Sequence, residues 1–350
     1  MTSKKWIKIF TDDTEYSADS VEWCPHEPNQ NLFVCGTYQL QENNTETPQT
    51  RIGRLYLYSI SIDKNTLKCL QRIDTAAILD IKWCHNQINS KSILAAANAL
   101  GQLLIFELQP TYTLKLITNF QIPNSDPGKD LLSLSIDWST GKYENSNPEI
   151  VVSDSTGYIT ILKYENEQLN LKFNWKAHDF EAWICAFDYW NSNLIYTGGD
   201  DCKLKMFDIR NLMNPILVKS NHEAGVTSLQ FNTKFEHIFV SGSYDENILI
   251  WDNRSMKRPL STIKTSGGVW RLKWDPFSFN KILAACMYGS FHILNVDDHS
   301  NPEIIANYCE HASICYGADW CYIQDDSKQK YIGTCSFYDH LLNVSKIYFE

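Results

Sequence analysis

Six consecutive residues, HDFEAW at positions 178–183, gather a histidine, two carboxylates and an indole without any glycine. Histidine and carboxylate side chains are the usual proton donors and acceptors of enzymes. A tryptophan beside them offers a flat aromatic face that attracts cations. The same residue types also occur in loops that only connect strands, so the chemistry depends on where the fold places this segment.

Two later segments show that the sequence repeats itself. GGDDCKLKMFDIR (198–210) and GSYDENILIWDNR (242–254) share their glycine, aspartate, aromatic and arginine positions. A histidine precedes each of them at the same interval, since His178 is as far from Asp201 as His222 is from Asp245. This pattern resembles the WD repeat, in which roughly 40–45 residues form four antiparallel strands and one blade of a propeller.

Short apolar segments that end in an aromatic residue recur along the whole chain. We count seven such aromatic anchors, at Trp23, Trp83, Trp138, Tyr189, Phe231, Trp274 and Trp320. The sequence therefore predicts an all-β fold, a seven-bladed WD-repeat propeller that occupies residues 1–350 as a single domain. Wide spacing of the early anchors predicts longer polar loops there, notably 39–50 and 123–130.

The last blade is one strand short, because only three strand-like segments follow residue 314. The N-terminal segment KKWIKIFT precedes the first complete blade and can supply the missing strand. We expect residues 1–12 to close the ring in this way, which leaves no long open sheet edge.

Several polar residues fit structural positions of the WD repeat. The resemblance implies a buried hydrogen-bonded chain of histidine, serine, aspartate and tryptophan in a complete blade. In the fifth blade the matching residues are His222, Ser241, Asp245 and Trp251; in the fourth, His178 and Asp201 match, with Phe207 in place of tryptophan.

Composition narrows the class of protein. The net charge of −10 argues against a nucleic-acid surface, which needs clustered lysine and arginine. The eleven cysteines lie singly in apolar segments and are interpreted as reduced core thiols. Neither a signal peptide nor a long apolar span is visible, so we expect a soluble, cytoplasmic monomer without membrane or nucleic-acid partners.

Loops that lead into the innermost strands share one face of a propeller with the turns between the second and third strands. HDFEAW is a loop of the first kind, so its Asp179, Glu181 and Trp183 should lie on that face. The same registration adds Asp200, Tyr244, Gly267, Gly268, Trp270, Arg271, Tyr316, Tyr338 and His340. Aromatic rims of this kind also bind peptides, so a pure interaction surface remains open.

Seven segments of the chain resemble one family closely, and the strong match covers roughly residues 175–349. The segments are HDFEAW (178–183), GGDDCKLK (198–205), GSYDENILIWDNR (242–254), GGVWRLKWDPF (267–277), LAACMYGSFHILN (283–295), YGADW (316–320) and CSFYDH (335–340). They are similar to the diphthine methyl ester hydrolase family of the diphthamide pathway, whose older name is diphthine methyltransferase. The first three blades match only in general pattern.

The resemblance implies a carboxylic ester hydrolase that removes a methyl group from methylated diphthine on the modified histidine of translation elongation factor 2. The freed carboxylate would then be amidated to diphthamide. The alternative is a non-catalytic WD-repeat adaptor that presents a partner protein to another enzyme.

Residue types on the expected rim fit both steps of such a reaction. His340, Asp179, Glu181 and Asp200 are candidate bases that activate a water, and Arg271 and Tyr338 are candidates to stabilise the oxyanion. Trp183, Tyr244, Trp270 and Tyr316 are candidates for a cage around the substrate's trimethylammonium group. The sequence shows no GxSxG motif and no metal triad, so we expect neither a metal nor a cofactor.

Overall fold

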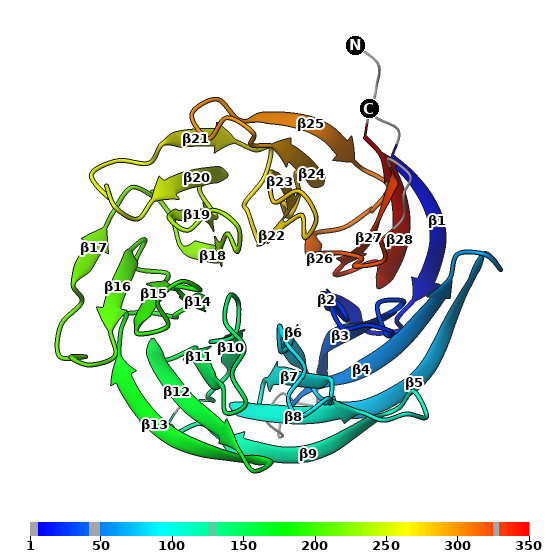
Figure 1. The fold of residues 1–350 in the computed structure, drawn as a ribbon, viewed down its shortest axis with the longest axis horizontal. Coiled ribbons are helices and arrows are strands. Elements are labelled where there is room, and N and C mark those ends of the chain that lie inside the picture. Colours follow the sequence, from blue (N-terminus) through cyan, green and yellow to red (C-terminus); the bar gives the residue numbers. More distant parts are fainter. Residues whose placement is uncertain (1–5, 42–49, 126–127, 129, 325–328, 350) are drawn as a thin grey trace.

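A computed structural model describes residues 6–41, 50–125, 128, 130–324 and 329–349. These residues form 28 strands in seven four-stranded antiparallel sheets, arranged as blades around a central channel (Figure 1). The predicted seven-bladed β-propeller is therefore confirmed. Within the described residues, no helix reaches the length and apolarity that a membrane span requires.

Six blades consist of four consecutive strands, with the first strand innermost. Blade one is β2 (Ser17–Trp23), β3 (Leu32–Gln41), β4 (Thr50–Ser61) and β5 (Thr66–Ala76). Blade two is β6 (Ile78–Trp83), β7 (Ile93–Asn98), β8 (Gln102–Leu108) and β9 (Leu114–Gln121). Blade three is β10 (Ser133–Trp138), β11 (Glu149–Asp154), β12 (Tyr158–Glu165) and β13 (Gln168–Lys176).

The remaining consecutive blades are shorter. Blade four is β14 (Ile184–Phe187), β15 (Leu194–Gly198), β16 (Leu204–Asp208) and β17 (Leu217–Lys219). Blade five is β18 (Val226–Phe231), β19 (Ile238–Ser243), β20 (Asn247–Asp252) and β21 (Ser261–Lys264). Blade six is β22 (Arg271–Trp274), β23 (Lys281–Ala285), β24 (Phe291–Asn295) and β25 (Glu303–Tyr308).

Blade seven joins the two ends of the chain. It contains β26 (Cys315–Trp320), β27 (Gln329–Ser336), β28 (Leu341–Tyr348) and β1 (Trp6–Asp13). β1 pairs antiparallel with β28 from Trp6 opposite Ile347 to Asp13 opposite Leu341, as the outermost strand in Figure 1. The Trp6 ring also stacks on Tyr308 with 5.0 Å between the ring centroids, which ties the closing strand to blade six.

The two long polar segments differ in position. The segment 39–50 lies inside blade one, where residues 39–41 end β3 and Thr50 begins β4, while residues 42–49 lie outside the described part. The segment 123–130 connects blades two and three, and residues 126, 127 and 129 lie outside the described part.

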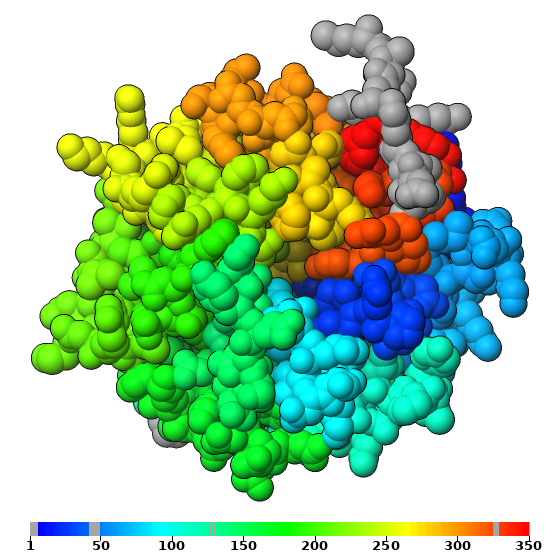
Figure 2. Space-filling model, viewed as in Figure 1, coloured from blue at the N-terminus to red at the C-terminus, as the bar shows by residue number. Residues whose placement is uncertain are grey.

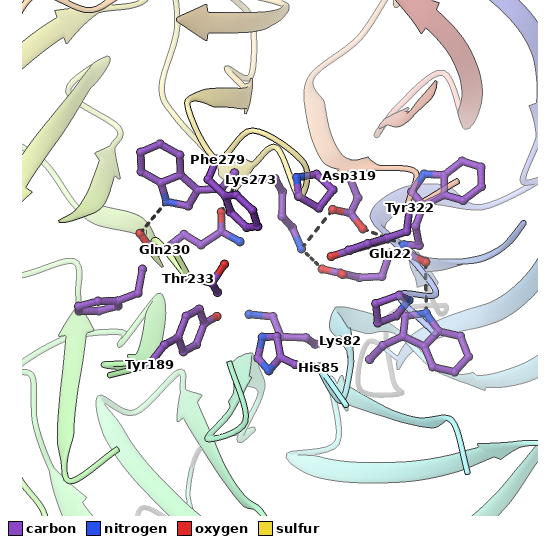
Figure 3. Close-up of a pocket in the computed structure, with 16 residues that line it drawn as sticks. Glu22, Lys82, His85, Tyr189, Gln230, Thr233, Lys273, Phe279, Asp319 and Tyr322 are labelled. Carbon is purple, nitrogen blue, oxygen red and sulfur yellow. Dashed lines mark hydrogen bonds and ion pairs between the residues drawn. The ribbon is translucent and has the colours of Figure 1, made fainter. Parts of the chain in front are cut away.

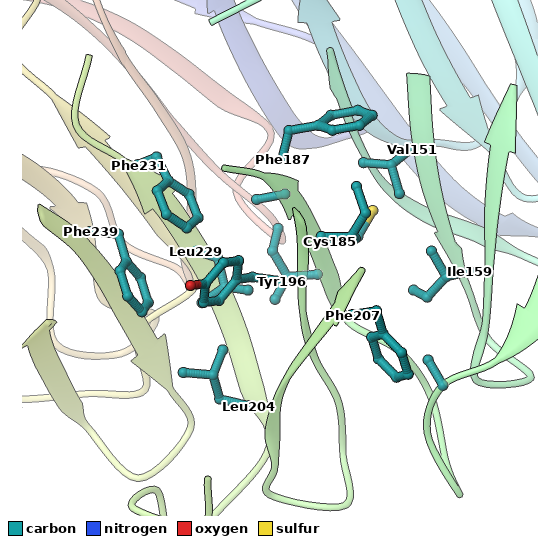
Figure 4. Close-up of a cluster of buried hydrophobic side chains, with 14 of the residues drawn as sticks. Val151, Ile159, Cys185, Phe187, Tyr196, Leu204, Phe207, Leu229, Phe231 and Phe239 are labelled. Atoms are coloured by element: carbon teal, nitrogen blue, oxygen red, sulfur yellow. The ribbon is translucent and has the colours of Figure 1, made fainter. Parts of the chain in front are cut away.

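The apolar core lies between neighbouring blades. Between blades four and five, Phe231 stacks on Phe239 with 4.8 Å between ring centroids, and Tyr196 approaches Phe231 at the same distance (Figure 4). Each fully buried aromatic side chain of this kind contributes about 1.5–3 kcal/mol to stability. Blade-to-blade packing is therefore what holds the ring at its observed curvature.

Tryptophan anchors also connect neighbouring blades through hydrogen bonds. Trp138 Nε1 donates to the Lys82 carbonyl at 3.0 Å, and Trp320 Nε1 donates to the Lys273 carbonyl at 3.0 Å. In both pairs the acceptor immediately precedes the anchor of the previous blade. Trp138 and Trp320 thus bury their rings and donate to a backbone carbonyl of the preceding blade at the same time.

Blade five contains the hydrogen-bonded chain that its sequence indicates. His222 contacts Asp245 Oδ2 through Nδ1 at 2.9 Å and Ser241 Oγ through Nε2 at 2.8 Å. Trp251 Nε1 donates to the same Ser241 Oγ at 2.9 Å. All four side chains are buried or nearly so, so these contacts replace hydrogen bonds to water.

Blade four has a related network. His178 contacts Asp201 through Nδ1 and Thr197 through Nε2, both at 2.8 Å. Burial lowers the pKa of His178, against the opposing effect of Asp201. A Cβ atom on Gly199 would lie 2.5 Å from His178 Nδ1, which explains the glycine at position 199.

Blade seven has a third network that the sequence analysis did not identify. His311 Nε2 contacts Thr334 at 3.0 Å and its Nδ1 contacts Ser336, whose hydroxyl also donates to Asp339. His311 therefore occupies the structural histidine position of this blade, and His340 does not belong to this network.

Deletion of residues 1–12 should destabilise the whole ring, because blade seven loses its outer strand and the Trp6 stacking. We expect the melting temperature to fall by about 5 °C or more, since each kcal/mol is worth about 2 °C in a domain of this size. Differential scanning calorimetry measures this directly, and an unchanged melting temperature would reject closure by β1.

Ser241→Ala should destabilise blade five, because His222 Nε2 and Trp251 Nε1 both lose their buried partner. A loss of about 2–4 kcal/mol is expected from denaturant unfolding, at about 1–3 kcal/mol per unsatisfied group. Thr262→Ala, at an exposed position of β21, is the matched control and should change stability little. Equal stability of the two variants would contradict a structural role for the network.

Candidate functional site

The channel widens into a cavity at each of its two mouths. Residues at the beginnings of the innermost strands line one cavity, and residues at their ends line the other. One face of the ring, with a recess near its centre, is visible in the space-filling view (Figure 2). The cavity at the beginnings of the innermost strands is called the upper cavity, and the cavity at their ends the lower cavity. The upper cavity contains rim residues that the sequence analysis singled out.

In the lower cavity the charged groups neutralise one another. It has a volume of about 250 Å³ and is shown in Figure 3. Lys273 forms ion pairs with Glu22 and Asp319, and Lys82 pairs with Asp137 at 3.0 Å. These charges are therefore used to connect blades, and none of these five groups is left to bind a charged ligand.

A belt of aromatic rings lines the upper cavity, whose volume is about 870 Å³. Trp270 stacks on Tyr316 with 4.8 Å between centroids, and Trp183 stands edge-on to Trp270 at 5.8 Å. Tyr244 lies 6.0 Å from both tryptophans. The structure thus brings together all four residues that were expected to form a cage.

Phe337 and Tyr338 extend the belt into blade seven. Phe337 lies 5.1 Å from Tyr316 and 5.1 Å from Tyr338, ring centroid to ring centroid. Tyr338 is 68% exposed, so its ring stands at the mouth of the cavity. The aromatic surface therefore runs without interruption from blade four to blade seven.

The three carboxylates expected on the rim have different positions. Glu181 is half-buried and lines the cavity. Asp200 is exposed and accepts a hydrogen bond from Trp183 Nε1 at 3.0 Å, so it orients the indole from outside. Asp179 is exposed, does not belong to the cavity wall, and lies 3.9 Å from Lys203.

His340 lies at the wall of the upper cavity and has a left-handed backbone conformation, with φ of 57°. Its carbonyl accepts hydrogen bonds from both the amide and the hydroxyl of Thr14, at 2.9 Å each. The backbone of His340 is therefore fixed by the segment that follows the closing strand β1.

Arg271 lies below the cavity instead of on its wall. The guanidinium is mostly buried and pairs with Asp80 across the channel at 3.3 Å, joining blades six and two. Arg271 was expected to stabilise the oxyanion. In the structure its guanidinium is paired with the Asp80 carboxylate and does not line the cavity. Its charge acts on the cavity from beneath.

Sequence reasoning missed the wall that the first three blades provide. Asp19, Tyr38, Leu79, Leu134 and Arg51 line the upper cavity together with Phe337. A signal for three of them existed, since Asp19, Leu79 and Leu134 precede their anchors by the same four positions as Trp270 and Tyr316. These blades carry no distinctive motif, so the correspondence was not drawn.

The arrangement suits a cationic organic group. Aromatic faces attract a quaternary ammonium without needing a hydrogen bond, and Glu181 adds a negative charge to the wall. In the residues that the structure describes, no group of three or more histidine, cysteine, aspartate or glutamate side chains is placed to hold a metal ion.

Comparison with known proteins agrees with the propeller fold. The WD40 family (WD domain, G-beta repeat) matches residues 213–252. A solved chain from the "Crystal Structure of Mitotic Checkpoint Complex" superposes with a TM-score of 0.73 over 100% of this chain and 94% of that chain. At 14% identity, this likeness concerns the fold alone.

Curated relatives are much closer in sequence. Diphthine methyltransferase of Mus musculus is 42% identical, over 89% of this chain and 69% of the relative. The Homo sapiens protein of the same name is 38% identical, over 91% and 76%. The Dictyostelium discoideum homologue is 36% identical, over 94% and 96%. The chain therefore belongs to the diphthine methyltransferase family.

Proposed function

We propose that this protein is a carboxylic ester hydrolase that demethylates methylated diphthine on the modified histidine of translation elongation factor 2. Membership of the diphthine methyltransferase family supports a role in diphthamide biosynthesis. The observation that carries the finer proposal is the aromatic upper cavity with carboxylates at its wall.

Size and shape support a protein-borne substrate. A volume of about 870 Å³ lies within the usual range for organic ligands, while a folded partner is too large to enter. A single modified side chain can enter the cavity and reach the indoles of Trp183 and Trp270 while its protein rests on the rim. The substrate would thus be recognised by its modified histidine side chain, which protrudes from the elongation factor.

Binding of the trimethylammonium group follows from the rings. Each well-placed aromatic face contributes about 0.5–2 kcal/mol to cation binding. Trp270 and Tyr316 form a stacked pair, and Trp183 closes the side. The net charge of −10 adds a long-range attraction for a cationic site.

Hydrolysis also needs a base for the water and donors for the oxyanion. His340 at the wall remains a candidate base. Trp270 Nε1 is buried without a hydrogen-bond partner in the described part of the chain, which makes it a donor that a bound carbonyl can satisfy. The hydroxyls of Tyr244 and Tyr316 are further donors at the same wall.

Mass spectrometry of elongation factor 2 tests the proposed reaction. The factor, carrying methylated diphthine, is incubated with the purified protein alone, without added metal or cofactor. We expect the modified peptide to become lighter by one CH2 unit and methanol to appear in equal amount, because water replaces the methoxy group.

Two other results would contradict the proposal. An unchanged mass together with a stable complex would support a WD-repeat adaptor that presents the factor to another enzyme. A gain of one CH2 unit upon addition of a methyl donor would support transfer of a methyl group instead.

Trp183→Ala should weaken substrate binding without unfolding the blade, because the indole is half-buried and stands at the cavity wall. We expect KM to rise about 5- to 30-fold, equivalent to about 1–2 kcal/mol of lost cation–π attraction. Tyr112→Ala, which removes an exposed ring elsewhere, is the control. Unchanged kinetics of a folded Trp183→Ala protein would remove this residue from the site.

A further inference from the structure

Irregular strand pairing directs one side chain of the innermost strand into the channel. The pairing register shifts in β2 between Ala18 and Ser20, in β6 between Ile78 and Asp80, and in β10 between Ser133 and Ser135. A β-bulge of this kind leaves one residue unpaired and re-aims its side chain. The residues at these bulges are Asp19, Leu79 and Leu134.

The same position is apolar or aromatic in four of the other six blades, while blade four has Cys185 and blade five has Thr227, whose hydroxyl donates to the Val269 carbonyl. Counted back from the anchors, blades two and three place Leu79 and Leu134 there, and blades six and seven place Trp270 and Tyr316. Together with Asp19, these residues all line the upper cavity. Blade one therefore contributes the only carboxylate at this position of the ring.

Asp19 is buried with one carboxylate oxygen that lacks a hydrogen-bond partner. Its exposure is 4%, and its Oδ1 has no hydrogen-bond partner among the described residues. Burial raises the pKa of Asp19 to about 8, while the Arg271 charge acts in the opposite direction. A buried, unpartnered carboxylate is costly for the fold, so it calls for a functional explanation.

Neighbouring buried acids of the channel differ in this respect. Asp80 pairs with Arg271 and accepts a hydrogen bond from the Ile136 amide at 2.9 Å. Glu22 pairs with Lys273. Their charges are used within the fold, whereas the Asp19 carboxylate is directed to the cavity that receives the substrate.

We propose that Asp19 is the general base of the reaction in the upper cavity, an inference that rests on the proposed ester hydrolysis. A water bound between Asp19 and the ester would give one proton to the carboxylate as its oxygen bonds to the carbonyl carbon. The carbonyl electron pair moves onto oxygen. Collapse of this intermediate breaks the bond to the methoxy oxygen, which takes the proton from Asp19 and leaves as methanol.

The aromatic cage makes this base responsive to its substrate. A quaternary ammonium held by Trp270 and Tyr316 favours the ionised form of a nearby carboxylate. Burial raises the pKa of Tyr316, and the charge of nearby Asp19 raises it further. Substrate binding and activation of the base are thereby coupled.

Asp19→Asn tests the assignment, because the amide keeps the shape of the carboxylate and cannot accept the proton. We expect kcat to fall at least about 100-fold, the usual range for loss of a general base. KM should change less than about threefold, since the aromatic cage is intact. Glu223→Gln removes an exposed acid outside the cavity wall and should leave kcat unchanged.

Asp19→Ala with added formate provides a second measurement that does not depend on the asparagine variant. The shortened side chain leaves room for a small carboxylate, and formate should restore part of the lost kcat. Rescue of this kind is not expected if Asp19 merely supports the fold. Melting temperatures of both variants show whether the ring remains intact.

The possible results distinguish the role of Asp19 as general base from the proposed ester hydrolysis. Loss of kcat with formate rescue supports Asp19 as the base. Full kcat in a folded Asp19→Asn protein would overturn it, and so would a raised KM at unchanged kcat, which indicates a counter-ion only. An inactive parent protein would overturn ester hydrolysis itself and the role of Asp19 with it.

Discussion

Antiparallel pairing of β1 with β28 is the constraint on which the rest of the structure depends. It joins the first and last parts of the chain in one sheet and so closes the ring of seven blades. The seam also runs through the site, because Thr14, just after β1, holds the carbonyl of His340. Tyr38 of blade one meets Phe337 of blade seven across the same seam at 5.8 Å. Closure therefore completes the wall of the upper cavity.

The charged side chains of the channel are paired at some depths and unpaired at others. In the middle and at the lower mouth, carboxylates and lysines from different blades neutralise one another, as Glu22 and Lys273 do. Removing one member of such a pair leaves a buried charge, so these residues act mainly in stability. Asp19 at the upper cavity is the exception among the acids discussed, since it combines burial with an unpartnered oxygen. The contrast separates the part of the channel that holds the ring together from the part that can act on a ligand.

The fold could be predicted because its determinants are local and repeated. Trp23, Trp83 and Trp320 end innermost strands as expected, and the pattern of His222 and Asp245 identifies a complete blade. The cage residues were also predictable, because Trp183, Trp270 and Tyr316 lie at or just before the start of an innermost strand. Tyr244 lies in the turn between the second and third strands of its blade. Arg271 illustrates the limit: it follows Trp270 directly, and one step along a strand is enough to place its side chain below the cavity instead of at its wall. Asp19 escaped prediction because blade one carries no distinctive motif, and because the burial of its unpartnered oxygen is a property of the closed ring.

The central claim is that the modified side chain of elongation factor 2 enters the cavity at the beginnings of the innermost strands. A crystal structure of the Asp19→Asn protein with a peptide carrying methylated diphthine tests it most directly. The account predicts the trimethylammonium group between Trp183, Trp270 and Tyr316, with the ester carbonyl facing position 19. A side chain bound in the lower cavity beside Lys273, or on the outer strands of the blades, would contradict the account.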